Sequence, residues 1–497
     1  MSSIMLTSVP VHGHVTPLLP IAEGFVRRGD DVRFLTGSRF ADKVRATGAT
    51  FIPLPEEADF DDRTHLEDFP ERAGLRGSRA VAFDIDHIFA RPAKAQYEAI
   101  IAAARQPIDV VITDPTFGGA VFLLAHPRAQ RPAVVMCGVV PLGVRSRDTA
   151  PFGMGLPPAR MFNRQRNAVL EALSRRVLRD ATRTTNALHR QVHGTDLRFD
   201  LMDWSRHVDA MVQLSVAAFE YPRSDAPPNL HFAGPVTAGG ASSPLPDWWS
   251  DLDGTRPVVH VTQGTVANTD YRQTIAPTLA ALAGDDDLLV VVATGGRPVD
   301  TLPPLPANAR AATYLPYDEL LPRTAVYVTN GGYGGVQYAL RHGVPIVATG
   351  GKEDKPEVGA RVAWSGVGRR IRAEHPSPRA IRRAVNDVLS DPPPLAPKIT
   401  YQKHADTLPE FLQMLRLRVQ LEDGADATQP NRLVVASLND IDRRMLKESF
   451  RIARTLQQRL RLGQPGLEGV HGFTIPFAVS AAMAPPATAL SRPLPDR

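Results

Sequence analysis

A glycine-rich run in the second half of the chain is the pattern with the clearest chemistry. The run Asn330–Gly335 follows a strand-like segment and precedes a helical pattern over Val336–Arg341. Glycines at such a turn let the backbone approach a ligand closely, and the free amides of a helix N-terminus attract an anion. We therefore predict a phosphate or pyrophosphate site, with a plain tight turn as the alternative. The glycines that would form it are Gly331, Gly332, Gly334 and Gly335.

Two other turns follow strand-like segments in the same half of the chain. Gly264 and Thr265 follow the apolar run Val258–Thr262, and Asp354 and Lys355 follow a later strand. In a doubly wound sheet, ligands bind at the carboxyl ends of the strands, so these turns would lie at one edge. The Thr265 hydroxyl would donate to the phosphates or cap a helix. Asp354 would accept hydrogen bonds from sugar hydroxyls, with a surface ion pair as the alternative.

A histidine and an aspartate stand at strand ends in the first half. His14 lies in the loop after the first apolar segment, and Asp114 ends the strand-like run Val110–Thr113. A carboxylate that holds one imidazole tautomer makes the histidine a better general base. We therefore predict a catalytic pair of His14 and Asp114, with a structural or helix-capping role for His14 as the alternative.

Alternating strands and helices must position these residues, and the alternation occurs twice. It predicts an α/β fold with two Rossmann-like domains, each built on a parallel sheet with covered faces. We predict a first domain over residues 1–220, a linker rich in proline and glycine over 221–256, and a second domain over 257–392. The segment from Met154 to Leu201 is rich in arginine and alanine and is predicted to be helical.

Composition indicates a globular protein and excludes several classes. The chain has 497 residues, 43% hydrophobic residues and a net charge of +5. We expect no nucleic acid partner, because lysine and arginine are dispersed among acidic residues. The single cysteine, Cys137, fits a reducing cytoplasm, and we expect no signal peptide. No apolar run reaches the roughly 18 residues of a membrane span, so no stable membrane insertion is expected.

Three blocks of the chain resemble nucleotide-sugar-dependent glycosyltransferases of the macrolide and plant UDP-glycosyltransferase type. His12–Pro17 resembles the GHxxP motif that holds the family's catalytic histidine, here His14. Ile112–Pro115 resembles the strand end whose aspartate pairs with that histidine, and Tyr314–Gly368 resembles the donor-binding signature. The resemblance covers about residues 3 to 390 and implies the glycosyltransferase B fold, in which the two domains face each other across a cleft.

The resemblance implies an inverting sugar transfer without a metal ion or a cofactor. The nucleoside diphosphate sugar would be a co-substrate, and a hydroxyl of a small, lipophilic molecule would be the acceptor. His14 would deprotonate that hydroxyl, and the cradle of glycines with Thr265 would stabilise the departing diphosphate. Leu315 and Tyr317 would flank the base, and Asp354 with Lys355 would grip the sugar. We expect a monomer or a weak homodimer.

Three positions depart from the family's pattern. Asn330 stands where a histidine usually donates to the pyrophosphate; an Asn amide can also donate, but without a positive charge. Tyr338 replaces the glutamate that holds the ribose hydroxyls, and Lys355 replaces a glutamine. Because deoxyribose offers one hydroxyl fewer, these changes make a dTDP-sugar at least as plausible a donor as a UDP-sugar.

The C-terminal tail departs further. Residues 400–464 are predicted to be helical, and they resemble the helical end of a substrate-binding domain from bacterial nucleotidyltransferases. Residues 465–497 are rich in alanine, proline and glycine and are predicted to be disordered.

Two other functions stay open at this stage. A catalytically impaired sugar-nucleotide-binding protein is suggested by Asn330, Tyr338 and the altered tail. A sugar-nucleotide 2-epimerase shares the architecture, although the loop around His14 suits an external acceptor.

Overall fold

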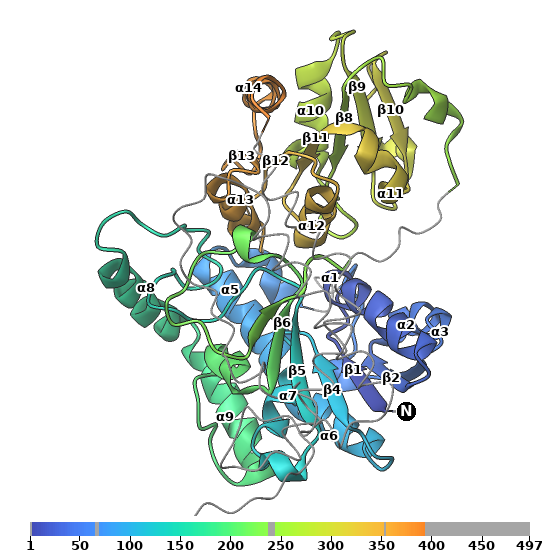
Figure 1. Ribbon diagram of the computed structural model, residues 1–497. Helices are drawn as coiled ribbons and strands as arrows, with labels where there is room; N and C mark the ends of the chain where they lie inside the picture. Colours follow the sequence, from blue (N-terminus) through green and yellow to red (C-terminus); the bar gives the residue numbers. More distant parts are fainter. Residues whose placement is uncertain (1, 65–68, 237–243, 352–353, 393–497) are drawn as a thin grey trace, which may run out of the picture. The chain divides into compact units, whose positions relative to one another are not determined.

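The first domain is built on a sheet of seven parallel strands in the order β3-β2-β1-β4-β5-β6-β7 (Figure 1). The protein is described from a computed structural model, which covers residues 2–64, 69–236, 244–351 and 354–392. The strands are β1 (Ser3–Thr7), β2 (Asp31–Thr36), β3 (Thr50–Pro53), β4 (Val110–Thr113), β5 (Ala133–Gly138), β6 (Ala210–Gln213) and β7 (Leu230–Phe232).

Helices cover both faces of this sheet because the strand side chains are apolar on both sides. In β1, Ile4 and Leu6 pack into a core with Phe25 of α2, whereas Met5 packs into a second core with Tyr97 of α6. Fully buried parallel strands are continuous apolar runs for this reason. The helices are α1 (His12–Val15), α2 (Leu19–Arg27), α3 (Ala41–Ala46), α5 (Ser78–Asp84), α6 (Ala93–Ala103), α7 (Gly118–Leu123), α8 (Asn163–Val177) and α9 (Arg179–His193).

The second domain repeats the design with six parallel strands in the order β10-β9-β8-β11-β12-β13. These are β8 (Val258–Thr262), β9 (Leu289–Ala293), β10 (Ala309–Ala312), β11 (Thr324–Thr329), β12 (Ile346–Ala348) and β13 (Gly368–Arg370). The helices are α10 (Ile275–Leu282), α11 (Tyr317–Leu320), α12 (Tyr333–Arg341), α13 (Lys355–Trp364) and α14 (Pro378–Ser390). Helices α10 and α14 share one core with the sheet, and α12 and α13 share another.

Both predicted Rossmann-like domains are confirmed, and each sheet reverses its strand order once. The reversal falls between β1 and β4 in the first sheet and between β8 and β11 in the second. Such switch points leave a crevice at the carboxyl ends of the strands. The predicted sites of His14 with Asp114, and of Gly264 with Gly331, lie at these two edges.

Two predictions about organisation need comment. Strand β7 lies inside the predicted linker 221–256, so the first sheet continues beyond residue 220; three residues between proline-rich turns give little signal of a strand. The predicted helical tail 400–464 and the predicted disordered segment 465–497 lie outside the described residues. Within the described residues, no helix combines the length and the apolar character that crossing a membrane requires.

Candidate active site

His14 and Asp114 meet at the switch point of the first sheet. Asp114 directly follows β4, and His14 lies in the short helix α1 that follows β1. The His14 Nδ1 atom is 3.1 Å from Asp114 Oδ1. The side chain of His14 is 11% exposed, whereas that of Asp114 is fully buried. The structure therefore brings the two predicted residues together, with the imidazole at the surface of the pair.

Asp114 is held by hydrogen bonds at both carboxylate oxygens. The Val9 amide donates to Oδ2 at 2.8 Å, and the Thr116 amide donates to Oδ1 at 2.7 Å. The Thr116 hydroxyl also donates to Oδ1, at 2.5 Å. Burial pushes the pKa of Asp114 upward, but the charge of His14 and the hydrogen bonds from His14 and Thr116 outweigh it, so this pKa lies below its usual value.

This arrangement assigns the proton on the imidazole. Because an ionised Asp114 only accepts hydrogen bonds, the Nδ1 atom of His14 carries a proton toward the carboxylate, and Nε2 is the ring nitrogen that faces away from it. Thr116 was missed by the sequence analysis. Its signal is local: a hydroxyl two residues after an aspartate, across Pro115, is typical of a turn that the aspartate caps.

Left-handed glycines line the equivalent edge of the second sheet. Gly264 after β8, Gly331 after β11 and Gly350 after β12 have φ angles of 71°, 92° and 95°. The turn after β9 contains two more, Gly295 and Gly296, with φ angles of 67° and 103°. Side chains are disfavoured in this conformation, so the edge exposes backbone rather than side chains. The glycine pair after β9 was missed by the sequence analysis.

The N-terminus of α12 presents free amides at this edge. Gly332 caps the helix without a side-chain hydrogen bond, and helix geometry leaves the amides of Tyr333, Gly334 and Gly335 without helical acceptors. A Cβ atom placed on Gly334 would meet no atom within 4 Å, so open space adjoins the first turn. The arrangement suits an anion that sits against the helix end.

Asn330 lies in a different environment from the one that the resemblance to the family's signature suggested. Its side chain is 2% exposed, and its Nδ2 donates to the carbonyl of Gln263 at 2.8 Å and to that of Ala267 at 3.4 Å. The amide hydrogens therefore bind the loop after β8. The expectation that they donate to a pyrophosphate finds no support in this geometry, because both are already used.

Lys355 places a buried cation next to the glycine turns. Its side chain is 5% exposed at the first position of α13. A Cβ atom on Gly350 would meet its Cδ at 3.2 Å, and one on Gly331 would meet its Cβ at 3.6 Å. Asp354, the N-cap of the same helix, is half-buried. The structure thus brings Lys355, which the resemblance assigned to the sugar, close to Gly331, which was assigned to the phosphates.

Leu315 lies in the core, and Tyr317 is partly buried and packs against the same core; both were predicted to flank a base. Leu315 is 7% exposed and packs with Val258 and Leu289. The Tyr317 hydroxyl donates to His260 Nε2 at 3.1 Å. The exposed aromatic side chain of this segment is Tyr314, which is 53% exposed.

Tyr338 and Thr265 lie near the same edge with partial exposure. The Tyr338 hydroxyl donates to Asp318 Oδ2 at 3.0 Å, so this side chain ends on a carboxylate. Thr265 follows the exposed Gly264 in the loop after β8. Among the residues that the structure describes, no group of three or more His, Cys, Asp or Glu side chains has the geometry of a metal site.

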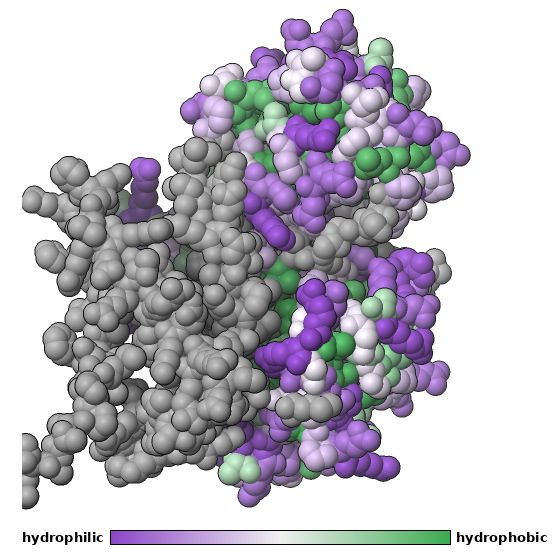
Figure 2. Space-filling model, turned by 45° about the vertical axis from the view of Figure 1, so that its right-hand side comes forward, coloured by the Kyte–Doolittle hydropathy of each residue, from purple (hydrophilic) through white to green (hydrophobic). Residues whose placement is uncertain are grey.

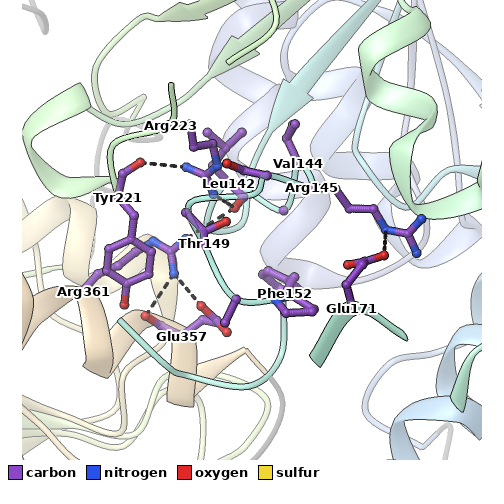
Figure 3. A pocket seen from close by; sticks show the side chains of 14 residues that line it. Leu142, Val144, Arg145, Thr149, Phe152, Glu171, Tyr221, Arg223, Glu357 and Arg361 are labelled. Carbon is purple, nitrogen blue, oxygen red and sulfur yellow. Dashed lines mark hydrogen bonds and ion pairs between the residues drawn. The ribbon is translucent and has the colours of Figure 1, made fainter. Parts of the chain in front are cut away.

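A buried ion-pair cluster connects α13 to the first domain, and Figure 3 shows its Arg361–Glu357 pair beside Tyr221. Arg361 donates to Glu220 at 2.8 Å and to Glu357 at 2.6 Å, and all three side chains are at most 5% exposed. Its guanidinium lies 4.4 Å from the ring centre of Tyr221. Because Glu357 also accepts from the Gly155 amide at 2.6 Å, a loop of the first domain is fixed beside the start of α13.

A family model covers the second domain, and another covers part of the tail. The model described as "Erythromycin biosynthesis protein CIII-like, C-terminal domain" matches residues 277–410. The model described as "Putative nucleotidyltransferase substrate binding domain" matches residues 403–463, which lie outside the described part of the chain.

Curated relatives and solved structures match most of the chain. The 4'-demethylrebeccamycin synthase of Lentzea aerocolonigenes is 41% identical, over 78% of this chain and 92% of that protein. UDP-glycosyltransferase 2 of Phaeomoniella chlamydospora is 36% identical, over 78% of this chain and 89% of that protein. The glycosyltransferase of kitacinnamycin has a TM-score of 0.63 at 21% identity, over 84% of this chain and 98% of that one. A spinosyn rhamnosyltransferase complexed with thymidine diphosphate has a TM-score of 0.58 at 16% identity, over 83% of this chain and all of that one.

Proposed function

The chain belongs to the nucleotide-sugar-dependent glycosyltransferases of the macrolide and UDP-glycosyltransferase type, and we propose that it inverts the anomeric carbon during a metal-independent transfer. The donor is a UDP- or dTDP-sugar, and the acceptor is a hydroxyl of a small lipophilic molecule. The single observation that carries this proposal is the hydrogen-bonded pair of His14 and Asp114. Family membership favours an enzyme over an impaired sugar-nucleotide-binding protein.

In the proposed reaction, His14 is the general base. The acceptor hydroxyl donates its proton to His14 Nε2 while its oxygen attacks the anomeric carbon of the donor. The bond from that carbon to the diphosphate oxygen breaks, and the electron pair leaves with the nucleoside diphosphate. A single displacement inverts the anomeric configuration. Asp114 and Thr116 position the imidazole and stabilise the positive charge that it gains.

The leaving diphosphate gains negative charge, which the second domain would stabilise. The first-turn amides of α12 supply aligned hydrogen-bond donors, and the buried Lys355 supplies a positive charge beside Gly331 and Gly350. Together they account for leaving-group stabilisation without a metal ion or another cofactor. Asp354 would accept hydrogen bonds from the sugar hydroxyls.

Tyr314, rather than Leu315 or Tyr317, is proposed to stack on the base because its ring is exposed. UDP is named in several relatives, and thymidine diphosphate is named in two of the matched structures. Both nucleotides are therefore included in the proposal. The lipophilic acceptor is supported by the natural products in the names of matched proteins, among them kitacinnamycin and spinosyn.

The decisive test separates donor binding from transfer. In His14→Ala, transfer to an acceptor should fall by about 10²- to 10⁴-fold, the usual contribution of a general base. Donor affinity, measured by calorimetry with UDP- and dTDP-sugars, should stay unchanged because His14 does not touch the glycine turns. Undiminished transfer in this variant would refute the mechanism. A wild-type protein that binds a donor but neither hydrolyses nor transfers its sugar would refute the enzyme.

A further inference from the structure

Helix α8 exposes two large apolar side chains to solvent, whereas its one buried residue is polar. Asn167 is the one side chain of α8 that is fully enclosed, and its Nδ2 donates to the Arg147 carbonyl at 3.1 Å. Val169 and Leu173, by contrast, are 71% and 52% exposed. A surface helix normally presents its apolar stripe to the core. The reversed pattern indicates that the outer face has a partner of its own.

The apolar stripe continues past the N-terminus of α8. Met161 and Phe162 are 72% and 71% exposed. Leu173 follows Val169 by four residues, so these two lie along one side of the helix, and Phe162 directly precedes the first helical residue. We refer to Met161, Phe162, Val169 and Leu173 together as the α8 stripe.

The backbone at Phe162 is strained, and its ring is exposed. Its φ of 51° is the sole positive φ of a non-glycine residue in the described ranges. A bulky side chain in the left-handed region costs free energy, and such strain is typically found at functional positions. The exposed ring makes no core contact that would offset this cost. On the face shown in Figure 2, by comparison, hydrophobic residues of the described surface are interspersed with hydrophilic ones.

Positive charge is concentrated around the stripe. Residues 156–193 contain eight arginines, no lysine and two acidic residues, a net charge of +6 in a chain whose total is +5. Arg160, Arg176 and Arg179 are exposed and form no ion pair among the described residues. Arg176 follows Val169 by seven residues and so borders the stripe. Arg164, Arg175, Arg183 and Arg190 of the same segment form ion pairs, so the exposed positive charge beside α8 comes from the arginines without such partners.

We propose that the α8 stripe and its arginines dock on an anionic lipid surface. Exposed aromatic and aliphatic side chains on a helix edged by arginines suit the boundary between headgroups and acyl chains, with the arginines on lipid phosphates. A second copy of the chain fits less well, because a two-fold contact through the stripe would bring two sets of arginines together. Docking would bring the enzyme to acceptors that partition into bilayers. This last use rests on the proposed acceptor class, whereas the docking itself does not.

The test is flotation of the full-length protein with vesicles. The protein should float with vesicles of phosphatidylcholine and phosphatidylglycerol at low salt, remain unbound with phosphatidylcholine alone, and detach as salt rises. Val169→Ser combined with Leu173→Ser should weaken binding about tenfold or more. Ile101→Ser, at an apolar position of α6 that is 46% exposed, is the matched control and should bind like the wild type. Arg176→Gln should weaken binding to anionic vesicles without creating binding to neutral ones.

Phe162→Gly separates the proposal from misfolding. Glycine relaxes the left-handed backbone, so the melting temperature should hold or rise while vesicle affinity falls. Transfer to a water-soluble acceptor should be unchanged in all these variants, so the docking surface and the active site can fail independently. The proposal is overturned if the wild type does not float with anionic vesicles, or if the stripe variants bind as well as Ile101→Ser. It is also overturned if the stripe variants dissociate a dimer of this protein without any effect on its flotation with vesicles.

Discussion

The two sheets share one architecture, yet the proposed binding edge of the first presents side chains and that of the second presents backbone groups. At the edge of the first sheet, the imidazole of His14 pairs with the carboxylate of Asp114, which accepts hydrogen bonds from Val9 and Thr116. At the edge of the second, glycines turn the chain after four strands and leave helix amides open. A base needs one proton site in one orientation, which side chains provide. An anion needs many donors at close approach, which bare backbone provides.

The histidines of the two sheets show the same division. His14 lies beyond the end of β1, beside a carboxylate and partly exposed. His260 lies within β8 and is completely buried; its Nδ1 donates to the Val291 carbonyl at 2.8 Å, and its Nε2 accepts from Tyr317. Burial lowers the pKa of His260 to about 4, although the hydrogen bond to Val291 opposes the shift. The partly exposed His14 suits the proposed role of a base, whereas the buried His260 is placed to remain neutral.

Among the substitutions that test this comparison, Asp114→Asn should have the largest effect, a loss of sugar transfer. An amide at this position can donate to His14 Nδ1 and favour the wrong tautomer, so transfer should fall by about 10³-fold. The affinity for the donor, measured by calorimetry, should not change, because the residue serves the first sheet alone. An equal loss of donor affinity would contradict the division of labour between the sheets.

Thr116→Val is the graded companion to that variant. It removes the hydroxyl that donates to Asp114 Oδ1 but keeps the amide that donates to the same atom. Transfer should therefore fall by less than in Asp114→Asn, and the acid limb of the pH–rate profile should shift. A loss of stability with an unchanged pH profile would assign Thr116 a structural role instead.

The second prediction concerns the pH dependence of stability. The unfolded chain protonates His260 near pH 6.5, whereas the folded chain does so only near pH 4. Between these values the unfolded state binds one more proton than the folded state. The contribution of His260 to stability is therefore complete above pH 6.5 and is lost as the pH falls toward 4. The expected loss is about 3 kcal/mol of the free energy of unfolding. Denaturant unfolding at several pH values measures it.

His260→Gln is the control for this prediction, since an amide can make both hydrogen bonds without titrating. The variant should show a flatter pH dependence between 6.5 and 4, whatever its absolute stability. If its slope equals that of the wild type, other groups carry the acid sensitivity, and His260 is not the buried neutral histidine described above.

The fold and the pairing of His14 with Asp114 could be predicted from the sequence, because both follow from short apolar runs and the residues directly after them. His14 and Asp114 each follow an apolar run, and the carboxyl ends of adjacent parallel strands must meet. The glycine turns at Gly264 and Gly331 followed from the same rule. The contact of Thr116 with Asp114 was not predicted, because it depends on which hydroxyl reaches the carboxylate across the turn.

Predictions that depended on which way a side chain points were less successful. Leu315 and Tyr314 are neighbours in sequence, but the first packs in the core and the second is exposed. The segment is too short for its hydrophobic pattern to show which of the two side chains is buried. Asn330 shows the related limit: its residue type allows donation to a phosphate, but two backbone carbonyls accept its hydrogens. The glycine pair after β9 did have a signal, a Gly-Gly turn after an apolar run, which could have been used.

The smallest expected effect, and the most selective for the second sheet, is that of Gly334→Ala. The new methyl group meets no protein atom within 4 Å, and alanine stabilises a helix by roughly 0.5–1 kcal/mol relative to glycine. Stability should therefore hold or rise. The methyl group would nevertheless occupy the open space against the first turn of α12, so the affinity for a nucleoside diphosphate should fall about tenfold, a loss of about 1.4 kcal/mol. Gly24→Ala in α2, which is equally uncrowded, should gain stability without losing affinity. Calorimetry on both variants distinguishes a phosphate cradle from a plain tight turn, because only a cradle makes a harmless methyl group costly to the ligand.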